Sequence, residues 1–272
     1  MDAEVIVVGA GAIGTSTAKH LAEAGVDVMV LEKEPGPALH QSGRNSGVIH
    51  AGYQYEPGSF KARFATQGAT RLKAFCQEHG VPVDQGGLLV VARDDEEEAR
   101  LEATLARAKE NGVEARWLDE QGVQDVEPHA AGQAGLHVPS YASFDARSYV
   151  HALTGEAIRA GTSFLYDTHV ASIEQHRGRI KLDTSKGEIR ARAVVNAAGL
   201  FSDRLAQELC PDMRIVPFRG YYAELVPSKR SLVKSHIYPA PDPDLPFLGV
   251  HFSQRADGRV IVGPGAMLAF GR

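Results

Sequence analysis

The stretch that decides the fold is EVIVVGAGAIGTSTAKHLAEAGVDVMVLE, residues 4–32. The apolar run of residues 4–8 predicts a buried strand, and residues 12–24 have the spacing of a helix that ends before Gly25. Residues 27–31 form a second apolar run, which is closed by an acid. Together the three pieces predict a β-α-β unit of the usual length.

The glycines of this unit predict a dinucleotide site. Gly9 allows a tight turn, Gly11 leaves room for a pyrophosphate, and Gly14 lets the helix pack closely on the strand. The pyrophosphate would then meet free N–H groups at the positive end of the helix. Glu32, at the end of the second strand, can accept both hydrogen bonds of a ribose diol, and Lys33 beside it joins the predicted cofactor set.

Composition narrows the class of protein. The chain has 272 residues and a net charge of −5, so it offers no global positive field for nucleic acid. Two cysteines, Cys76 and Cys210, cannot form a disulfide framework, which is typical of a reducing compartment. Because no apolar run approaches a membrane span and the first strand begins at Glu4, we expect a cytoplasmic protein, with peripheral contact at the inner face of the membrane as an alternative.

The rest of the chain predicts an α/β fold with two interleaved domains. A long loop rich in Gly, Ser and His follows the β-α-β unit, and this favours FAD over NAD because such a loop can wrap a flavin. From Pro211 onward, short strand-like pieces dominate. We expect a Rossmann-type FAD-binding domain at residues 1–81 and 148–209, and a smaller α+β substrate domain at residues 82–147 and 210–272.

Helical spacing also predicts which side chains are buried. On the first helix Ile13, Ala18, Leu21 and Ala22 can share a face. The helix expected at residues 60–79 has a stripe of Phe64, Leu72 and Phe75, and the one expected at 94–111 has a stripe of Leu101, Leu105 and Ala108. A further helix is expected from Gly199 to about Leu209.

Several longer motifs occur in order along the chain. They are HQSGRNSGVIHAG at 40–52, VPS at 138–140, PFRGYY at 217–222, YPAPDP at 238–243, LPFLGVHF at 245–252 and GPGA at 263–266. On these motifs the sequence closely resembles the L-2-hydroxyglutarate dehydrogenases (oxidases), members of the D-amino-acid-oxidase-like FAD superfamily. The resemblance spans essentially the whole chain, and residues 40–52 and 238–252 are its most specific parts.

The chain departs from that family at residues 141–144, 220–222 and 263–266. These segments lie on the expected substrate side, so they bear on the identity of the substrate more than on that of the cofactor. Family members also continue well beyond Arg272, where a further segment contacts the flavin. The resemblance therefore implies a chain truncated at its C-terminus.

The resemblance also implies a set of cofactor contacts. Residues of the loop at 40–52 are expected along the pyrophosphate and the isoalloxazine, namely Ser42, Arg44, Asn45, Ser46 and Gly47. Val170 is expected to contact adenine through its backbone, and Gly199 to let the chain pass close to the flavin.

Two histidines are the candidates for proton transfer. Oxidation of a 2-hydroxy acid needs a base for the hydroxyl proton, and a histidine with a pKa near neutral suits this task. The motifs favour His251 as the base and His50 as a flavin or substrate contact, with the reverse assignment open. Arg219 can bind a substrate carboxylate through a bidentate fork, and Tyr222 can donate a hydrogen bond to the other. No histidine spacing indicates a metal site.

By resemblance, the expected reaction is FAD-dependent oxidation of L-2-hydroxyglutarate to 2-oxoglutarate, with hydride passing to flavin N5. The expected partners are this small dicarboxylate and an electron acceptor such as a membrane quinone. Two alternatives remain: a sister flavoenzyme acting on glycerol 3-phosphate or an amino acid, and a truncated, non-catalytic flavin-binding remnant.

Overall fold

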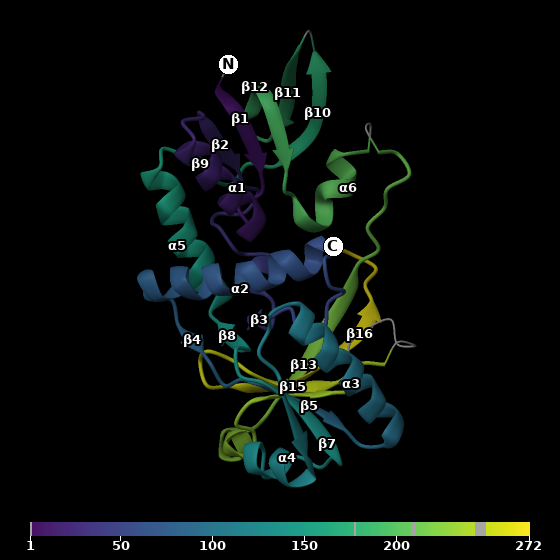
Figure 1. The fold of residues 1–272 in the computed structure, drawn as a ribbon. Coiled ribbons are helices and arrows are strands. Elements are labelled where there is room, and N and C mark those ends of the chain that lie inside the picture. The colour runs from purple at the N-terminus through teal and green to yellow at the C-terminus, as the bar shows by residue number, and fades with distance from the viewer. Residues whose placement is uncertain (1, 177, 208–209, 243–248) are drawn as a thin grey trace. The chain divides into compact units, whose positions relative to one another are not determined.

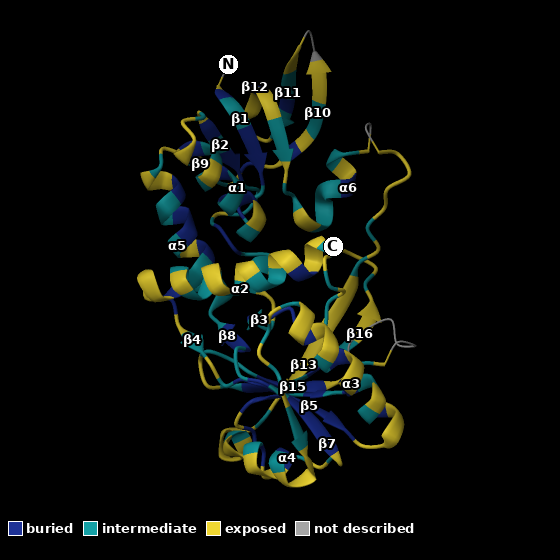
Figure 2. Cartoon of the chain, viewed as in Figure 1, coloured by how far each residue is buried: buried dark blue, intermediate teal, exposed yellow. Residues whose placement is uncertain are grey.

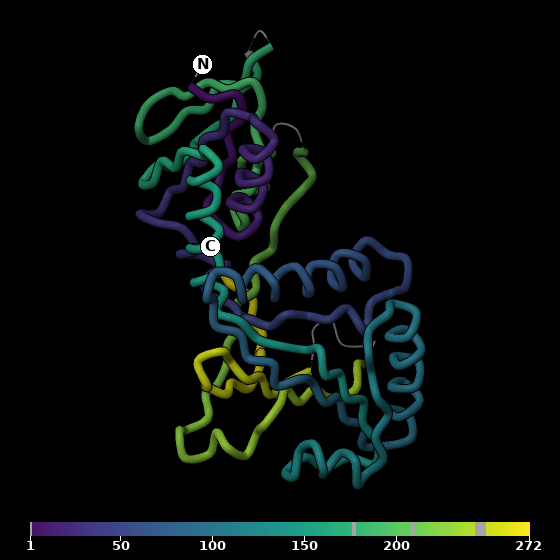
Figure 3. The backbone as a smooth tube through the Cα atoms, turned by 60° about the vertical axis from the view of Figure 1, so that its left-hand side comes forward, coloured from purple at the N-terminus to yellow at the C-terminus, as the bar shows by residue number. Residues whose placement is uncertain are grey.

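The computed structural model describes residues 2–176, 178–207, 210–242 and 249–272. Its backbone forms two compact units (Figure 1). Unit 1 comprises Met1–Asn45, Ala146–Pro217 and Leu268–Arg272, and unit 2 comprises Ser46–Asp145 and Phe218–Met267. Figure 3 traces how the purple N-terminal segment and the green segment that follows residue 146 together build unit 1.

A six-stranded sheet is the centre of unit 1. Its order is β10-β11-β12-β1-β2-β9, in which β12, β1, β2 and β9 are parallel and β10-β11-β12 is an antiparallel meander. Val8 pairs with both Leu31 and Asn196, so the carboxyl ends of three parallel strands meet at one edge, where doubly wound sheets bind ligands. The strands are β1 Ala3–Val8, β2 Val28–Leu31, β9 Ser163–Leu165, β10 Val170–His176, β11 Arg179–Thr184 and β12 Gly187–Asn196.

Helix α1 (Ala12–Glu23) packs on α5 (Ala146–Arg159) in this unit. The predicted strand–helix–strand order is confirmed, but the prediction that Ile13 is buried is wrong, because its side chain is 75% exposed. The buried residues of α1 include Gly14, Ala18 and Ala22, which recur every fourth position. Small side chains on this ridge allow close packing, and Ile13 lies about 100° around the helix from Gly14.

The helix expected up to Leu209 is shorter in the structure. A 3-10 turn, η2 (Gly199–Phe201), leads into α6, which spans Ser202–Leu205. The predicted end of this helix, residues 208–209, lies outside the described residues. A second short 3-10 turn, η1 (Gln41–Gly43), follows the β-α-β unit.

Unit 2 contains a seven-stranded sheet in the order β13-β16-β15-β14-β5-β7-β6 and a small sheet in the order β3-β8-β4. Its helices are α2 Phe60–Glu78, α3 Asp95–Glu110, α4 Glu120–Val126 and the 3-10 helix η3 Pro227–Leu232. Every residue of the central strand β5 is buried, as Figure 2 shows in dark blue. The strands are β3 Val48–Ile49, β4 Val83–Asp84, β5 Leu88–Ala92, β6 Arg116–Asp119, β7 Ala134–Val138, β8 Ala142–Phe144, β13 Phe218–Glu224, β14 His236–Pro239, β15 His251–Gln254 and β16 Val260–Leu268.

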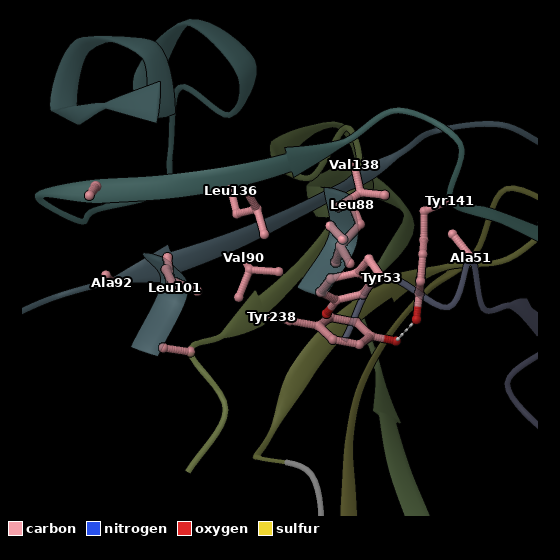
Figure 4. Close-up of a cluster of buried hydrophobic side chains, with 13 residues drawn as sticks. Ala51, Tyr53, Leu88, Val90, Ala92, Leu101, Leu136, Val138, Tyr141 and Tyr238 are labelled. Carbon is pink, nitrogen blue, oxygen red and sulfur yellow. Dashed lines mark hydrogen bonds between the residues drawn. The ribbon is translucent and has the colours of Figure 1, made fainter. Parts of the chain in front are cut away.

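One face of the large sheet carries the main core of unit 2. Successive side chains of a strand alternate between faces, and Tyr238 pairs with Val90 across β14 and β5. Tyr238, Val90, Leu136 and Tyr141 therefore lie in one cluster of buried side chains (Figure 4). Because Ile237 pairs with Phe252, the flanking residues His236, Tyr238 and His251 share that same face.

Residues 46–81 belong to unit 2, whereas the sequence analysis placed them in the FAD-binding domain. Strand β3 pairs with β8, with Val48 opposite Ser143. The side-chain amide of Asn111 also donates to the carbonyls of Gly52 and Tyr55, at 3.1 and 2.8 Å. These contacts join segments more than fifty residues apart in the sequence, so no local sequence pattern reveals them.

The predicted stripe of α2 is partly wrong. Phe64 is 59% exposed, and the buried residues of this helix are Ala62 and Cys76. Phe60 and Phe64 instead stack on each other with ring centroids 5.8 Å apart, and the Arg63 guanidinium lies over both rings. Mutual packing and cation–π contact keep part of their apolar surface covered although both face outward.

The predicted start of α3 is confirmed, because the Asp94 carboxylate accepts from the Glu97 N–H at 2.9 Å. The Glu97 carboxylate accepts a hydrogen bond from the backbone N–H of Arg93, at 2.8 Å. In the predicted stripe, Leu101 and Ala108 are buried and Leu105 is partly buried against the same core.

A buried carboxylate ties α4 to the segment that leads into β14. Glu127 is fully buried, and its Oε1 accepts from the Ser235 N–H at 2.5 Å and from the Ser235 hydroxyl at 2.6 Å. The same carboxylate accepts from the Lys234 N–H at 2.9 Å. These bonds fix the backbone immediately before His236.

We predict that Glu127→Gln destabilises unit 2 by about 1–3 kcal/mol, because an amide nitrogen replaces an acceptor oxygen and leaves buried donors unpaired. Trp117 in β6, the only tryptophan of the chain, reports unfolding of this unit through its fluorescence in urea. The exposed Glu120→Gln in the same helix is the control and should change stability by less than about 0.5 kcal/mol. Equal effects of the two variants would contradict the anchoring role.

Candidate cofactor and active site

The turn between β1 and α1 requires glycine at two positions. Gly9 has φ of +109°, and a Cβ there would lie 2.5 Å from the Ala197 carbonyl oxygen. A Cβ on Gly14 would lie 1.9 Å from the Gly9 carbonyl oxygen, which no real contact permits. Glycine at these two places therefore lets α1 begin directly against the ends of β1 and β12.

Gly11 is different, because its backbone does not require glycine. It is the N-cap of α1, with φ of −79°, and the nearest described atom to a Cβ there would be the Ser42 hydroxyl oxygen, at 3.0 Å. That hydroxyl accepts a hydrogen bond from the Ala12 N–H at 2.9 Å. Turn η1 thus brings Ser42 to the positive end of α1, as expected of a residue that lies along a pyrophosphate.

The Glu32 carboxylate is held in place by the backbone around it. Its Oε2 accepts from the Ala10 N–H at 2.7 Å, and its Oε1 accepts from the Glu34 N–H at 3.0 Å. Each carboxylate oxygen can accept more than one hydrogen bond, so acceptor capacity remains for a ribose diol. The orientation of this acid is therefore set before any ligand arrives.

A cavity of about 380 Å³ lies at this edge of the unit 1 sheet. Of the predicted cofactor residues, it is lined by Gly9, Gly11, Glu32, Lys33 and Val170. The side-chain-free turn, the helix N-terminus and the oriented acid fit the adenosine diphosphate half of FAD. Next to Val170 the β10–β11 register shifts, and such a bulge at a sheet edge re-aims the local backbone.

One wall of this cavity is basic and aromatic, and Lys33 is its only residue that was predicted from the sequence. Phe201 lines it, with the Lys33 ammonium 5.4 Å from its ring centre and the Arg204 guanidinium at the same distance. His40 packs edge-on against this ring, and its Nε2 lies 2.8 Å from Lys33 Nζ. The signal was available, because Phe201 and Arg204 follow the carboxyl end of β12, where such sheets bind ligands.

Of the other predicted cofactor residues, Asn45 and Gly47 have a role in the local backbone structure that does not involve a ligand. Asn45 donates from its side-chain amide to the carbonyls of Gln41 and Ser42, at 2.9 and 3.0 Å, which closes the η1 turn. Gly47 has φ of +73°, and a Cβ there would lie 2.4 Å from the Phe144 carbonyl oxygen. Arg44 is exposed. Gly199 has φ of +56°, and a Cβ there would lie 3.8 Å from the Gln41 side-chain oxygen, which is an ordinary contact distance. Their flavin contacts stay predictions.

Unit 2 holds a cluster of histidines and tyrosines on the core face of its large sheet. The rings of Tyr238 and His251 have centroids 4.1 Å apart. The Tyr141 hydroxyl lies 2.7 Å from Nδ1 of His50, and the Tyr141 ring is edge-on to His236 at 5.3 Å. The structure therefore brings together both predicted catalytic histidines, and it adds His236, which was not predicted as a site residue.

Burial keeps these histidines neutral. It is the largest cause that lowers the pKa of His50 and of His251, and it lowers the pKa of His236 to about 4. The neighbouring histidine His251 lowers the pKa of the other two further, because two nearby imidazolium charges repel each other. At pH 7 each imidazole thus has one protonated and one unprotonated nitrogen.

A backbone carbonyl decides which nitrogen of His251 is protonated. Nδ1 lies 2.8 Å from the Gly249 carbonyl oxygen, which can only accept a hydrogen bond. Nδ1 therefore holds the proton, and Nε2 has the lone pair of a potential base. His251 is also 5% exposed, so this lone pair lies in a largely dry environment.

The two predicted substrate residues, Arg219 and Tyr222, both lie on β13, where Arg219 is exposed. A Cβ on Gly263 would contact the Tyr222 ring at 2.8 Å, and Gly263 is paired with His251, so Tyr222 lies on the histidine face. Burial raises the pKa of Tyr222, and its hydrogen bond with Ser46 opposes that shift. The substrate roles stay predictions.

No helix in the described ranges combines the length and the apolar character that a membrane span requires. Across the same residues, His, Cys, Asp and Glu side chains form no group of three or more arranged to hold a metal ion.

The glycine turn, the oriented acid and the parallel sheet define a dinucleotide-binding protein of Rossmann type. Comparison with known proteins gives the family. The model of the family described as FAD dependent oxidoreductase matches residues 4–271, and the chain belongs to this family. FAD, the cofactor expected from the sequence, is the cofactor of this family. The cavity at the edge of the unit 1 sheet fits its adenosine diphosphate half.

Curated relatives agree with this assignment. The chain is 40% identical over 274 residues to an L-2-hydroxyglutarate dehydrogenase of Escherichia coli strain K12, covering 99% of this chain and 65% of that protein. It is 40% identical over 286 residues to the mitochondrial human L-2-hydroxyglutarate dehydrogenase, covering 99% and 62%. The chain thus spans less than two thirds of the length of these relatives.

Two solved structures share the fold. The FAD-bound, dithionite-reduced L-alpha-glycerophosphate oxidase of Mycoplasma pneumoniae matches with a TM-score of 0.87 and 24% identity, over 99% of this chain and 72% of the other. Glycine oxidase of Geobacillus kaustophilus matches with a TM-score of 0.80 and 21% identity, over 99% and 73%. At these identities the likeness establishes the fold alone.

We predict that Gly11→Val weakens FAD binding while the fold survives, because φ at this position suits any residue. Overpacking costs about 1–3 kcal/mol, which is about 5- to 150-fold in affinity. Gly36→Val is the control, since no atom of the described residues lies within 4 Å of a Cβ there. Flavin fluorescence titration measures both affinities, and unchanged binding by Gly11→Val would contradict the assigned pyrophosphate position.

Proposed function

We propose that this protein oxidises L-2-hydroxyglutarate to 2-oxoglutarate with FAD. The observation that carries the proposal is His251, a buried neutral histidine whose tautomer leaves Nε2 as a base. Relatives at about 40% identity that are named L-2-hydroxyglutarate dehydrogenases support the choice of substrate. Because the chain spans about 65% of such a relative, the proposal concerns the activity of the whole protein.

The proposed reaction removes a hydride from C2 of the substrate and a proton from its hydroxyl group. A bound FAD supplies the two-electron acceptor for the hydride. His251 takes the hydroxyl proton at Nε2, while its Nδ1–H stays bonded to the Gly249 carbonyl, so the ring cannot turn as it changes charge. Burial of the cluster excludes water from the base.

Recognition of the dicarboxylate is proposed to involve Tyr222 and Arg219. Tyr222 is the better supported, because it lies on the histidine face and bonds Ser46 of the predicted flavin loop. Arg219 offers a guanidinium fork for a carboxylate and is exposed on the same strand. The electrons are proposed to leave the reduced cofactor for an acceptor such as a quinone.

The experiment that tests the function is product analysis under anaerobic conditions. The FAD-loaded protein is mixed with L-2-hydroxyglutarate, its D-enantiomer, glycerol 3-phosphate or glycine, and 2-oxoglutarate is measured by mass spectrometry. We expect one 2-oxoglutarate per flavin reduced, from the L-enantiomer alone. Flavin reduction by glycerol 3-phosphate or glycine would instead identify a sister flavoenzyme, and no reduction by any of the four would indicate a non-catalytic remnant.

We predict that His251→Asn slows flavin reduction by about 10²–10⁴-fold, the usual worth of a positioned general base. The asparagine amide can still donate to the Gly249 carbonyl, so the variant removes the basic nitrogen and preserves that bond. His129→Asn, an exposed histidine of unit 2, is the control and should reduce at the rate of the parent protein. Equal rates in all three proteins would exclude His251 as the base.

The same base predicts the pH dependence. Burial lowers the pKa of His251 below the ordinary 6.5, so the imidazole stays unprotonated to a lower pH than a free histidine. Flavin reduction should therefore exceed half of its full rate at pH 6.5 and decline as the pH falls through this lowered pKa. Stopped-flow absorbance measures the profile, and a midpoint above pH 6.5 would contradict the assignment.

A further inference from the structure

Tyr141 lies at the centre of the histidine–tyrosine cluster. Its side chain is fully buried, and its ring is edge-on to four others at centroid distances between 5.3 and 6.2 Å. The four rings belong to His50, Tyr53, His236 and Tyr238. Figure 4 shows its hydroxyl directed towards that of Tyr238, where a dashed line joins the two.

The hydroxyl of Tyr141 has one proton and two neighbours that can accept it. Nδ1 of His50 is 2.7 Å away, which is an ordinary hydrogen-bond length, and the Tyr238 oxygen is 3.5 Å away, at the outer limit. An imidazole nitrogen is also a stronger base than a phenol oxygen. The geometry of the longer contact has Tyr141 as the donor and Tyr238 as the acceptor, but a single proton cannot serve both contacts. The shorter contact, to the stronger base, therefore takes the proton, which goes to His50.

The charge states of the two groups agree with this direction. Burial raises the pKa of Tyr141 well above 10, so the hydroxyl keeps its proton. Burial, His251 and Lys61 lower the pKa of His50, so the imidazole is neutral and has a single N–H. If Nδ1 accepts from Tyr141, that N–H must be at Nε2.

We propose that Tyr141 is a positioning residue that fixes His50 as the Nε2–H tautomer, so that His50 presents a hydrogen-bond donor where His251 presents an acceptor. The use of this donor in catalysis rests on the proposed function: it would bind an oxygen of the 2-hydroxy acid while His251 takes the proton. The tautomer itself does not depend on which substrate is used.

The opposite polarity of the two histidines follows from their partners. Gly249 offers His251 a carbonyl, which can only accept, and Tyr141 offers His50 a hydroxyl, which is free to donate. The two histidines thus acquire different roles, because Nδ1 of His251 contacts a backbone carbonyl and Nδ1 of His50 contacts a side-chain hydroxyl.

The test is an NMR titration of the ¹⁵N-histidine-labelled protein in the absence of substrate, with the His50 signals assigned from a His50→Asn variant. In the parent protein we expect an unprotonated Nδ1 and a protonated Nε2 on His50. In Tyr141→Phe, which keeps the ring and removes only the hydroxyl, the neutral form loses its donor. The pKa of His50 should then rise by about half to one unit, the worth of one hydrogen bond.

The sign of this shift separates the two hydrogen-bond directions. If His50 donated to Tyr141, loss of the oxygen would remove an acceptor from the imidazolium, and the pKa would fall. Tyr53→Phe is the matched control: its ring is edge-on to Tyr141 at 6.2 Å, and the pKa of His50 should be unchanged. A protonated Nδ1 in the parent protein, or a fall or no change in Tyr141→Phe, overturns the proposal.

The parent spectrum decides the tautomer even if Tyr141→Phe does not fold. Because no substrate is present, the result is independent of whether L-2-hydroxyglutarate is oxidised. Failure of this inference is therefore distinguishable from failure of the proposed function.

Discussion

The close approach of α1 to the ends of β1 and β12 is the constraint on which unit 1 depends. A Cβ on Gly14 would lie 1.9 Å from the Gly9 carbonyl, and a Cβ on Gly9 would lie 2.5 Å from that of Ala197. Only with both glycines can the positive end of the helix reach the edge where the parallel strands end. The oriented Glu32 and the cavity beside it follow from that placement.

In unit 2 the governing factor is burial of polar rings on one sheet face. Desolvation keeps His50, His236 and His251 neutral, and a neutral histidine has a donor and an acceptor whose order its neighbours decide. The Gly249 carbonyl and the Tyr141 hydroxyl set that order in opposite directions. Two histidines on this face therefore present different groups, His50 a hydrogen-bond donor and His251 an acceptor.

The sequence predicted those features that are local. The β-α-β unit with its glycines depends on neighbouring residues, and the structure confirms it. Features that depend on distant pairings were missed: Arg204 enters the cofactor cavity only because β12 pairs with β1, and residues 46–81 join unit 2 through β3 and β8. Periodicity failed at Ile13 and Phe64, because small side chains make the closest helix contacts and large ones can pack on each other outside.

The central claim is that the glycine turn and Glu32 form a site for FAD. Equilibrium dialysis of the cofactor-stripped protein against FAD, NAD and NADP tests it most directly. We expect one FAD bound per chain, with no competition from NADP, because the 2′-phosphate of NADP would meet the Glu32 carboxylate where a diol is required. NADP binding tighter than FAD, or no binding of FAD at all, would contradict the assignment of this site.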